Sequence, residues 1–299
     1  MQSIGDLRAE WGNVPDYGAI GEAVLSRDAD PKYRWVMLDS LVQYKRIVKD
    51  SRDARALLTL LDVVSWAEND TSFVRAKALT VEAGMIALFE EKGLIREARR
   101  REFGKKLAAL IEKEKDGDLL AAACIAAGSA DAGEAVPALR KHVRNENAPS
   151  LVRRTAAGSL GKLKDRESIP LIAEVMKNTT DRALYGSSAF ALGTMGGEEV
   201  VEPLVAHAGR FDTHSCGNAL RRNSATVARM LTDTQSPRLE NAIRAAGLAE
   251  MKETLPQLEA LEKDGRPEVR RAAKEARERI SRKPGGATPG ADARREVKP

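Results

Sequence analysis

Histidine, cysteine and aromatic residues are scarce in this chain of 299 residues. It holds three histidines and two cysteines, and aromatic side chains make up 4% of it. Two cysteines cannot build the disulfide framework that small secreted domains use. None of His142, His207 and His214 is followed by glutamate and no two are four residues apart, which excludes the helical zinc-protease signature. We therefore expect no metal site, no cofactor and no set of catalytic residues.

Long apolar runs are also missing. No stretch of about 18 apolar residues occurs, so the sequence predicts no membrane span. The first 30 residues carry too many charges for a signal peptide, and we expect a cytoplasmic protein by default. An export signal removed before Met1 would leave no trace here. The glycine-rich phosphate-binding motifs and the GxSxG motif of hydrolases are absent as well, which favours a protein that is not an enzyme.

Charge, by contrast, is abundant and unevenly placed. The formal net charge is +5, and residues 266–299 alone hold 11 basic and 5 acidic side chains. The basic excess therefore belongs to the end of the chain. From residue 283 onward the sequence is rich in proline, glycine and alanine and has no apolar face, which predicts disorder.

Four prolines mark a repeat in the second half of the chain. The first three stand 33 residues apart, and the fourth follows after 53. An alanine stands 14 residues before each proline, and a glycine stands nine residues before three of them. The prolines are Pro137, Pro170, Pro203 and Pro256, the alanines are Ala123, Ala156, Ala189 and Ala242, and the glycines are Gly128, Gly161 and Gly247.

This repeat predicts a pair of helices, A and B. The alanine lets helix A pack closely against its neighbour, and the proline fits the first turn of helix B because its missing N–H is harmless there. We expect the glycine to end helix A with a positive φ. A Val-Arg pair opens helix A at Val74-Arg75, Val152-Arg153 and Val269-Arg270.

The pattern resembles the HEAT repeats, most closely the short HEAT-like repeats named after phycobilisome lyases. The resemblance is firm over residues 118–209 and returns over 236–282, whereas only helical periodicity and Val74-Arg75 support it earlier. It implies an all-α fold, a right-handed α-solenoid of HEAT-like antiparallel helix pairs with B helices along the concave face. The His-Glu pairs with which the deoxyhypusine hydroxylases of this superfamily hold their metal are missing.

Six segments follow from these patterns. Nine of the 12 aromatic residues lie before residue 104, which indicates a bulkier core in the first half. We predict capping helices over 1–29, longer and aromatic-richer repeats over 30–117, regular HEAT-like repeats over 118–210, an aperiodic insert over 211–235, HEAT-like repeats over 236–282 and a disordered basic tail over 283–299.

A cation stands seven residues after each repeat proline. Arg144, Lys177 and Arg210 share this offset, as does Lys263 beyond the insert. A cation near the C-terminus of helix B complements the helix dipole. Stacked repeats would also align these side chains along one edge, where they could bind an acidic segment of a partner protein.

Two further groups are candidates for function. Residues 92–106 hold seven basic and two acidic side chains, and five of the basic ones would cover one side of a helix that could bind nucleic acid. His214 and Cys216 lie in the aperiodic insert near arginines, which lower a thiol pKa. The five basic residues are Arg96, Arg99, Arg100, Lys105 and Lys106.

The preferred hypothesis is a non-catalytic scaffold that binds another protein through the concave face of the solenoid. Two alternatives stand beside it. One is a chromophore-lyase-like enzyme or chaperone, which rests on the resemblance and on Cys216. The other is nucleic-acid binding through residues 92–106.

Overall fold

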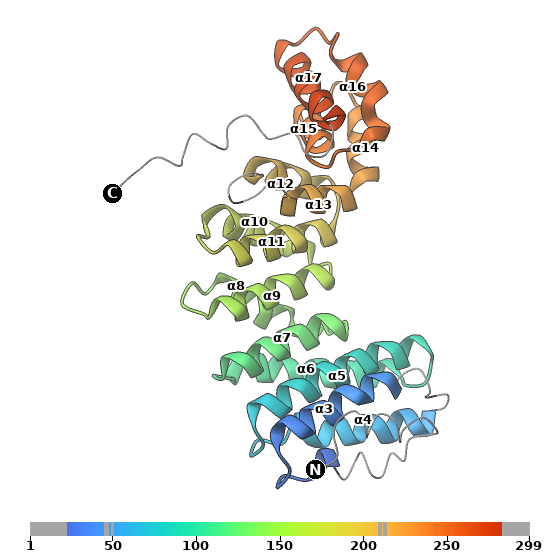
Figure 1. Cartoon of the computed structure of the whole chain (residues 1–299), viewed down its shortest axis with the longest axis vertical. Coiled ribbons are helices and arrows are strands. Elements are labelled where there is room, and N and C mark those ends of the chain that lie inside the picture. The colour runs from blue at the N-terminus through green and yellow to red at the C-terminus, as the bar shows by residue number, and fades with distance from the viewer. Residues whose placement is uncertain (1–22, 45–47, 49–50, 209–210, 212–213, 283–299) are drawn as a thin grey trace. The chain divides into compact units, whose positions relative to one another are not determined.

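The structure, a computed structural model, describes residues 23–44, 48, 51–208, 211 and 214–282 (Figure 1). All regular structure in these residues is helical. Most of the predicted N-terminal cap, Arg210 and the predicted basic tail lie outside them. The chain divides into two units, Met1–Met195 and Gly196–Pro299, each of which is a set of packed helices.

Four long helices lie in the first half of the part of the first unit that the structure describes. Their buried side chains are bulky, with Phe89 and Phe103 among the largest fully buried ones. A ring of Trp66 meets Phe103 edge to face, with centroids 6.0 Å apart. The four helices are α3 (Pro31–Tyr44), α4 (Ser51–Ser65), α5 (Ser72–Glu91) and α6 (Glu97–Lys113).

Five shorter helices complete this unit. The A helices α5, α7, α9 and α11 pack on one another in chain order, and the B helices α6, α8 and α10 form a second row (Figure 1). This arrangement is an α-solenoid of antiparallel helix pairs, as the repeat predicts. The helices are α7 (Gly117–Ser129), α8 (Val136–Arg144), α9 (Ser150–Lys162), α10 (Ile169–Asn178) and α11 (Arg182–Met195).

The described residues of the second unit form six α-helices. Helix α15 packs against α17, so two consecutive A helices are neighbours here too. Residues of the predicted aperiodic insert form two of the six, α13 and α14. The helices are α12 (Val201–His207), α13 (His214–Arg222), α14 (Ser224–Thr232), α15 (Leu239–Leu248), α16 (Leu255–Leu261) and α17 (Pro267–Ser281).

The repeat prolines lie where the sequence predicts. Pro137, Pro170 and Pro256 occupy the first turn of α8, α10 and α16, and Pro203 is the third residue of α12. A single turn of 3₁₀ helix precedes each of these helices. The four repeat alanines are completely buried within helices α7, α9, α11 and α15.

The repeat glycines do not end helix A, and this prediction was wrong. Gly161 is a residue within α9, and the left-handed conformation falls three positions later, at Lys164 with φ 51°. Asp131 and Glu250 have the same conformation at the same distance from Gly128 and Gly247. Three non-glycine residues therefore make the turn that we expected of glycine.

Close contact between A helices explains these glycines instead. A Cβ on Gly161 would lie 2.6 Å from Cα of Ala191, on the next A helix. A Cβ on Gly128 would lie 2.7 Å from Oγ of Ser159, and one on Gly247 would lie 2.9 Å from Cα of Ala276. Only a residue without a side chain fits at such a distance.

An arginine in the first turn of three helices joins consecutive pairs of helices, and two of these arginines, Arg75 and Arg153, belong to Val-Arg pairs. In α3, α5 and α9 the fourth residue is an arginine whose Nε donates to the backbone carbonyl ten residues earlier, near the end of the preceding helix. The last carbonyls of a helix lack an intrahelical partner, and the arginine supplies one. The bonds are Arg34 to Val24 at 2.8 Å, Arg75 to Ser65 at 3.3 Å and Arg153 to Val143 at 3.3 Å.

The division between the two units falls inside the block that we predicted as regular, residues 118–210. It lies between Met195 and Gly196, after the third A helix of the block. Gly196 and Gly197 both have positive φ, at 71° and 95°. At this point two successive residues have positive φ and both are glycine. At the corresponding turns after α7, α9 and α15, one residue has positive φ and it is not glycine.

Candidate partner-binding cleft

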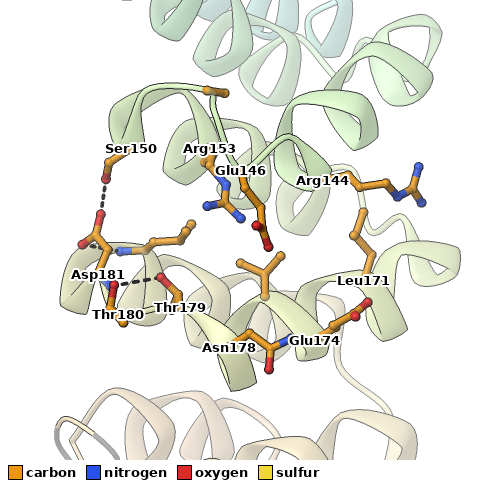
Figure 2. Close-up of a pocket in the computed structure, with 13 residues that line it drawn as sticks. Arg144, Glu146, Ser150, Arg153, Leu171, Glu174, Asn178, Thr179, Thr180 and Asp181 are labelled. Atoms are coloured by element: carbon orange, nitrogen blue, oxygen red, sulfur yellow. Dashed lines mark hydrogen bonds between the residues drawn. The ribbon is translucent and has the colours of Figure 1, made fainter.

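A cleft of about 400 Å³ lies between two consecutive helix pairs of the first unit. Its walls are the end of α8, the loop to α9, the first turn of α9, the outer side of α10 and the loop to α11 (Figure 2). The lining is largely polar, and Leu171 and Leu184 are among its few large apolar side chains. The cleft therefore offers hydrogen bonds and charge rather than an apolar surface.

One wall of the cleft is fixed by Asp181, which caps α11. Its carboxylate accepts the backbone N–H groups of Ala183 and Leu184, at 2.7 and 3.2 Å, and the hydroxyl of Ser150 (Figure 2). The hydrogen bond from Ser150 is the main reason why the pKa of Asp181 is held below its usual range, against the effect of burial. Asp181 is thus committed to structure.

The remaining charges of the cleft are two arginines and two glutamates. Arg153 comes from the first turn of α9 and Arg144 ends α8. Glu146 lies in the loop between these helices and Glu174 lies on α10. In Figure 2 the side chains of Arg153 and Glu146 both point into the cleft. The site therefore presents positive and negative groups close together.

The cations seven residues after the repeat prolines form the predicted ladder, Arg144, Lys177 and Arg210. The structure describes two of these three residues. Arg144 lies in the last turn of α8 and Lys177 in the last turn of α10, and both side chains are exposed. Both positions suit the helix dipole. Arg144 lines the cleft, Lys177 is not among the lining residues, and Arg210 lies outside the described residues.

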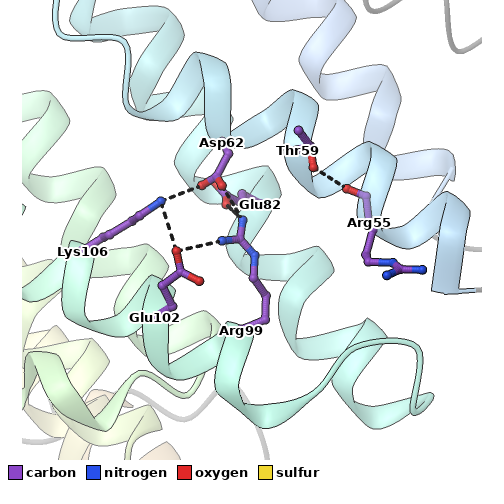
Figure 3. A network of polar contacts seen from close by, with 7 residues as sticks. All are labelled: Arg55, Thr59, Asp62, Glu82, Arg99, Glu102 and Lys106. Carbon is purple, nitrogen blue, oxygen red and sulfur yellow. Dashed lines mark hydrogen bonds and ion pairs between the residues drawn. The ribbon is translucent and has the colours of Figure 1, made fainter.

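The basic surface of α6 includes two cations that belong to an ionic network. Arg99 contacts Asp62 at 2.8 Å and Glu82 at 3.3 Å, and Lys106 contacts Asp62 at 3.3 Å and Glu102 at 3.7 Å (Figure 3). These pairs tie α6 to α4 and α5. Much of the positive charge that the sequence shows is thus directed at the protein's own carboxylates.

Of the other three predicted cations of this surface, one contacts carboxylates and two are exposed to solvent. Arg100 contacts Glu90 at 2.9 Å and Glu97 at 3.1 Å. Arg96 and Lys105 are exposed. The structure therefore places four of the five cations on α6 and Arg96 at its N-cap, and three of the five share their charge with carboxylates.

Glu82 is a buried carboxyl group that sequence reasoning did not identify. It is 0% exposed, and burial raises its pKa to about 8, with the charge of Asp62 acting in the same direction. Asp62 has a lowered pKa because the guanidinium of Arg99 outweighs its own burial. The signal was in the sequence, since Glu82 stands three residues after Leu79 and four before Ile86, on the buried face of α5.

Cys216 and His214 are placed differently from one another. Cys216 is completely buried in α13, and His214 is the exposed first residue of that helix. A buried thiol is inert towards reagents in solution.

Among the residues that the structure describes, no group of three or more His, Cys, Asp or Glu side chains is placed to hold a metal ion. Within the same residues, no helix has both the length and the apolarity needed to cross a membrane.

Comparisons with known proteins agree with this architecture. Residues 104–192 match the family model of HEAT repeats. The X-ray structure of YibA from Escherichia coli is similar at 15% identity and a TM-score of 0.50, over 93% of this chain and 98% of that one. Human deoxyhypusine hydroxylase in complex with glycerol aligns at 16% identity and a TM-score of 0.37, over 88% and 95%. A comparison with curated proteins finds no match.

The fold is thus that of an all-α solenoid built from helix pairs. The cleft lies within residues 104–192, the stretch that matches the HEAT-repeat family model.

Proposed function

We propose that this chain is a non-catalytic scaffold that binds another protein through the side of its HEAT-repeat stack. The observation that carries the proposal is the polar cleft between the helix pairs α8–α9 and α10–α11. A stack of repeats buries one continuous core and leaves helix-lined surfaces free along its length. The cleft is a recess in such a surface, and it lies in the stretch that matches the HEAT repeats.

The chemistry of the cleft suits an extended peptide segment. Thr179, Thr180 and Ser150 place hydroxyl groups along one side, and such groups both donate to and accept from a peptide backbone. Arg144 and Lys177 add exposed cations at the ends of α8 and α10. We propose that these two cations attract acidic side chains of the partner, as part of the ladder that the sequence predicts.

Site-specific photo-crosslinking in cell extract tests the proposal. A photoreactive amino acid replaces Glu146, in the loop between α8 and α9 at the cleft. The control places the same amino acid at Glu68, which is exposed in the corresponding loop between α4 and α5. We expect a discrete protein to be captured from position 146 and not from position 68. Capture of the same proteins from both positions, or of none from position 146, would contradict the proposal.

A further inference from the structure

The first arginine of the series shows what a complete contact looks like. Nε of Arg34 donates to the carbonyl of Val24 at 2.8 Å. Its Nη1 and Nη2 donate to the two carboxylate oxygens of Asp70, at 2.8 and 2.6 Å. The side chains of this pair are only 3% and 4% exposed. Every edge of the guanidinium is therefore used, in the bidentate geometry that arginine forms best with a carboxylate.

The second arginine of the series shares the bond to the carbonyl. Arg75 is the fourth residue of α5, as Arg34 is of α3, and its Nε donates to the carbonyl of Ser65 at 3.3 Å. Its charge also lowers the pKa of Asp116, the residue that caps the next A helix, although the backbone N–H of Leu119 has the largest effect. Only at Arg34, therefore, does the aspartate before the next A helix bond directly to the arginine.

Arg153 lacks the carboxylate contact of Arg34, and it lines the cleft. It is the fourth residue of α9, and its Nε donates to the carbonyl of Val143 at 3.3 Å. Among the described residues, its two Nη atoms have no hydrogen-bond or ion-pair partner, and the guanidinium points into the cleft (Figure 2). The aspartate before the next A helix, Asp181, is bonded to Ser150 and to the first turn of α11 instead.

We propose that Arg153 is the anchor of the cleft and binds a carboxylate of the partner. The carboxylate accepts from both Nη atoms, as Asp70 does at Arg34. This inference rests on the proposed function and names the group that the scaffold recognises. The bond from Nε to Val143 holds the guanidinium in place, so little side-chain entropy is lost when the ligand binds.

The other charges of the cleft limit the ligand further. Glu146 and Glu174 also line it, and they repel a run of acidic residues. A single carboxylate with a cation beside it satisfies both the arginine and the glutamates. The ligand class is therefore a peptide segment with one carboxylate next to a basic side chain. That carboxylate belongs either to an aspartate or glutamate side chain or to the C-terminus of a chain.

Nuclear magnetic resonance of the full-length protein with ¹⁵N-labelled arginine tests this assignment. The probes are three N-acetylated tetrapeptides. The first has the order threonine, lysine, aspartate, threonine and an amidated C-terminus. The second replaces its aspartate by asparagine, and the third is the asparagine peptide with a free C-terminal carboxylate. The signal of the Nε–H group of Arg153 is followed during each titration.

We expect the Arg153 signal to shift with the aspartate peptide or with the free C-terminal peptide, and not with the amidated asparagine peptide. Whichever carboxylate peptide binds identifies the source of the group. Equal shifts with all three peptides, or no shift with any, would overturn the assignment. This comparison uses the unmodified protein and does not depend on how a variant folds.

Substitution supplies a second test. Arg153→Lys keeps the charge and loses the bidentate fork, so we expect about tenfold weaker binding of the carboxylate peptide. The control is Arg154→Lys, since Arg154 is adjacent in α9 and is not a lining residue; its binding should be unchanged. Equal weakening in both variants would contradict the role of Arg153. If photo-crosslinking from position 146 persists in Arg153→Lys, the scaffold function stands and this assignment alone fails.

Discussion

Two regions of the first unit build the same architecture from different side chains. In α3–α6 the helices are separated by large buried groups such as Phe89 and Phe103, and Glu82 is buried among them. In α7–α11 the contacts between A helices are made by glycine and alanine, and a Cβ on Gly161 would lie 2.6 Å from Cα of Ala191. The comparison shows that this helical stack accepts either large side chains or close backbone contact between its helices.

Different kinds of substitution should therefore destabilise the two regions. A core of large side chains is damaged when atoms are removed, because a cavity remains. A core in which backbones touch is damaged when atoms are added, because neither helix can move away without loss of its other contacts.

The largest effect is expected from Phe103→Ala. Phe103 is completely buried and lies against Trp66, so its truncation should lower the free energy of unfolding by about 3–5 kcal/mol. The control is Phe73→Ala, since Phe73 is 51% exposed and its stacking on Trp35 is worth about 1 kcal/mol. Urea unfolding measures both. Equal losses would mean that the aromatic core of this region is not as described.

A smaller loss of stability is expected from Gly161→Ala, which adds atoms where Phe103→Ala removes them. The added methyl group meets the backbone of Ala191, which should cost about 1–3 kcal/mol. Gly158 lies one turn earlier in the same helix and a Cβ there meets nothing within 4 Å. Gly158→Ala should therefore raise stability, by up to about 1 kcal/mol, through helix propensity alone. Thermal unfolding of the two variants that shifts in the same direction would refute this account.

The buried carboxyl group of Glu82 predicts that the stability of the protein depends on pH. The pKa of Glu82 is about 8 in the folded chain, above its ordinary value of 4.5. The folded state therefore holds a proton that the unfolded state releases, and stability is full below about pH 4.5 and falls as the pH rises towards 8. The slope is at most about 1.4 kcal/mol per pH unit.

Glu82→Gln removes the titrating group and keeps its shape. We expect unfolding free energies of this variant at pH 5.5 and pH 8 to differ less than those of the unmodified protein. The lowered pKa of Asp62 acts only at lower pH and does not disturb the comparison. An unchanged pH dependence in the variant would show that Glu82 is ionised in the fold.

The smallest effect on stability is expected for the exposed cations. Replacing Arg144 and Lys177 by glutamine should cost at most about 1 kcal/mol each through the helix dipole. Capture of the partner from position 146 should fall at low salt. Lys162, in the last turn of α9 and away from the cleft, is the matched control for the dipole. If Lys162→Gln reduces capture as much, the ladder has no role in binding.

Much of the fold follows from the sequence because the repeat is a property of small residues and proline. Proline has few permitted positions in a helix, so Pro137 and Pro170 locate their helices well. The role of Gly161 did not follow, because a glycine near a helix end suits both a left-handed turn and a close approach. Only the position of Ala191 on the next helix separates the two.

The cleft was less accessible to sequence reasoning than the fold. The shared offset from the prolines identified Arg144, since helix length fixes where that residue lies. Arg153 was noted only as a marker of helix A. Its significance depends on Asp181 being bonded elsewhere, which is a fact about side-chain contacts between repeats. Spacing along the chain carries no information of that kind.

The arginine–carbonyl bonds described above also bear on how the chain folds. Each spans ten residues, and the contacts between consecutive A helices of the first unit span about 30, as from Gly161 to Ala191. Closing such short loops loses little entropy, and chains with mostly local contacts fold quickly. Each helix pair can therefore form and dock on its predecessor as it leaves the ribosome, before the rest of the chain has been made.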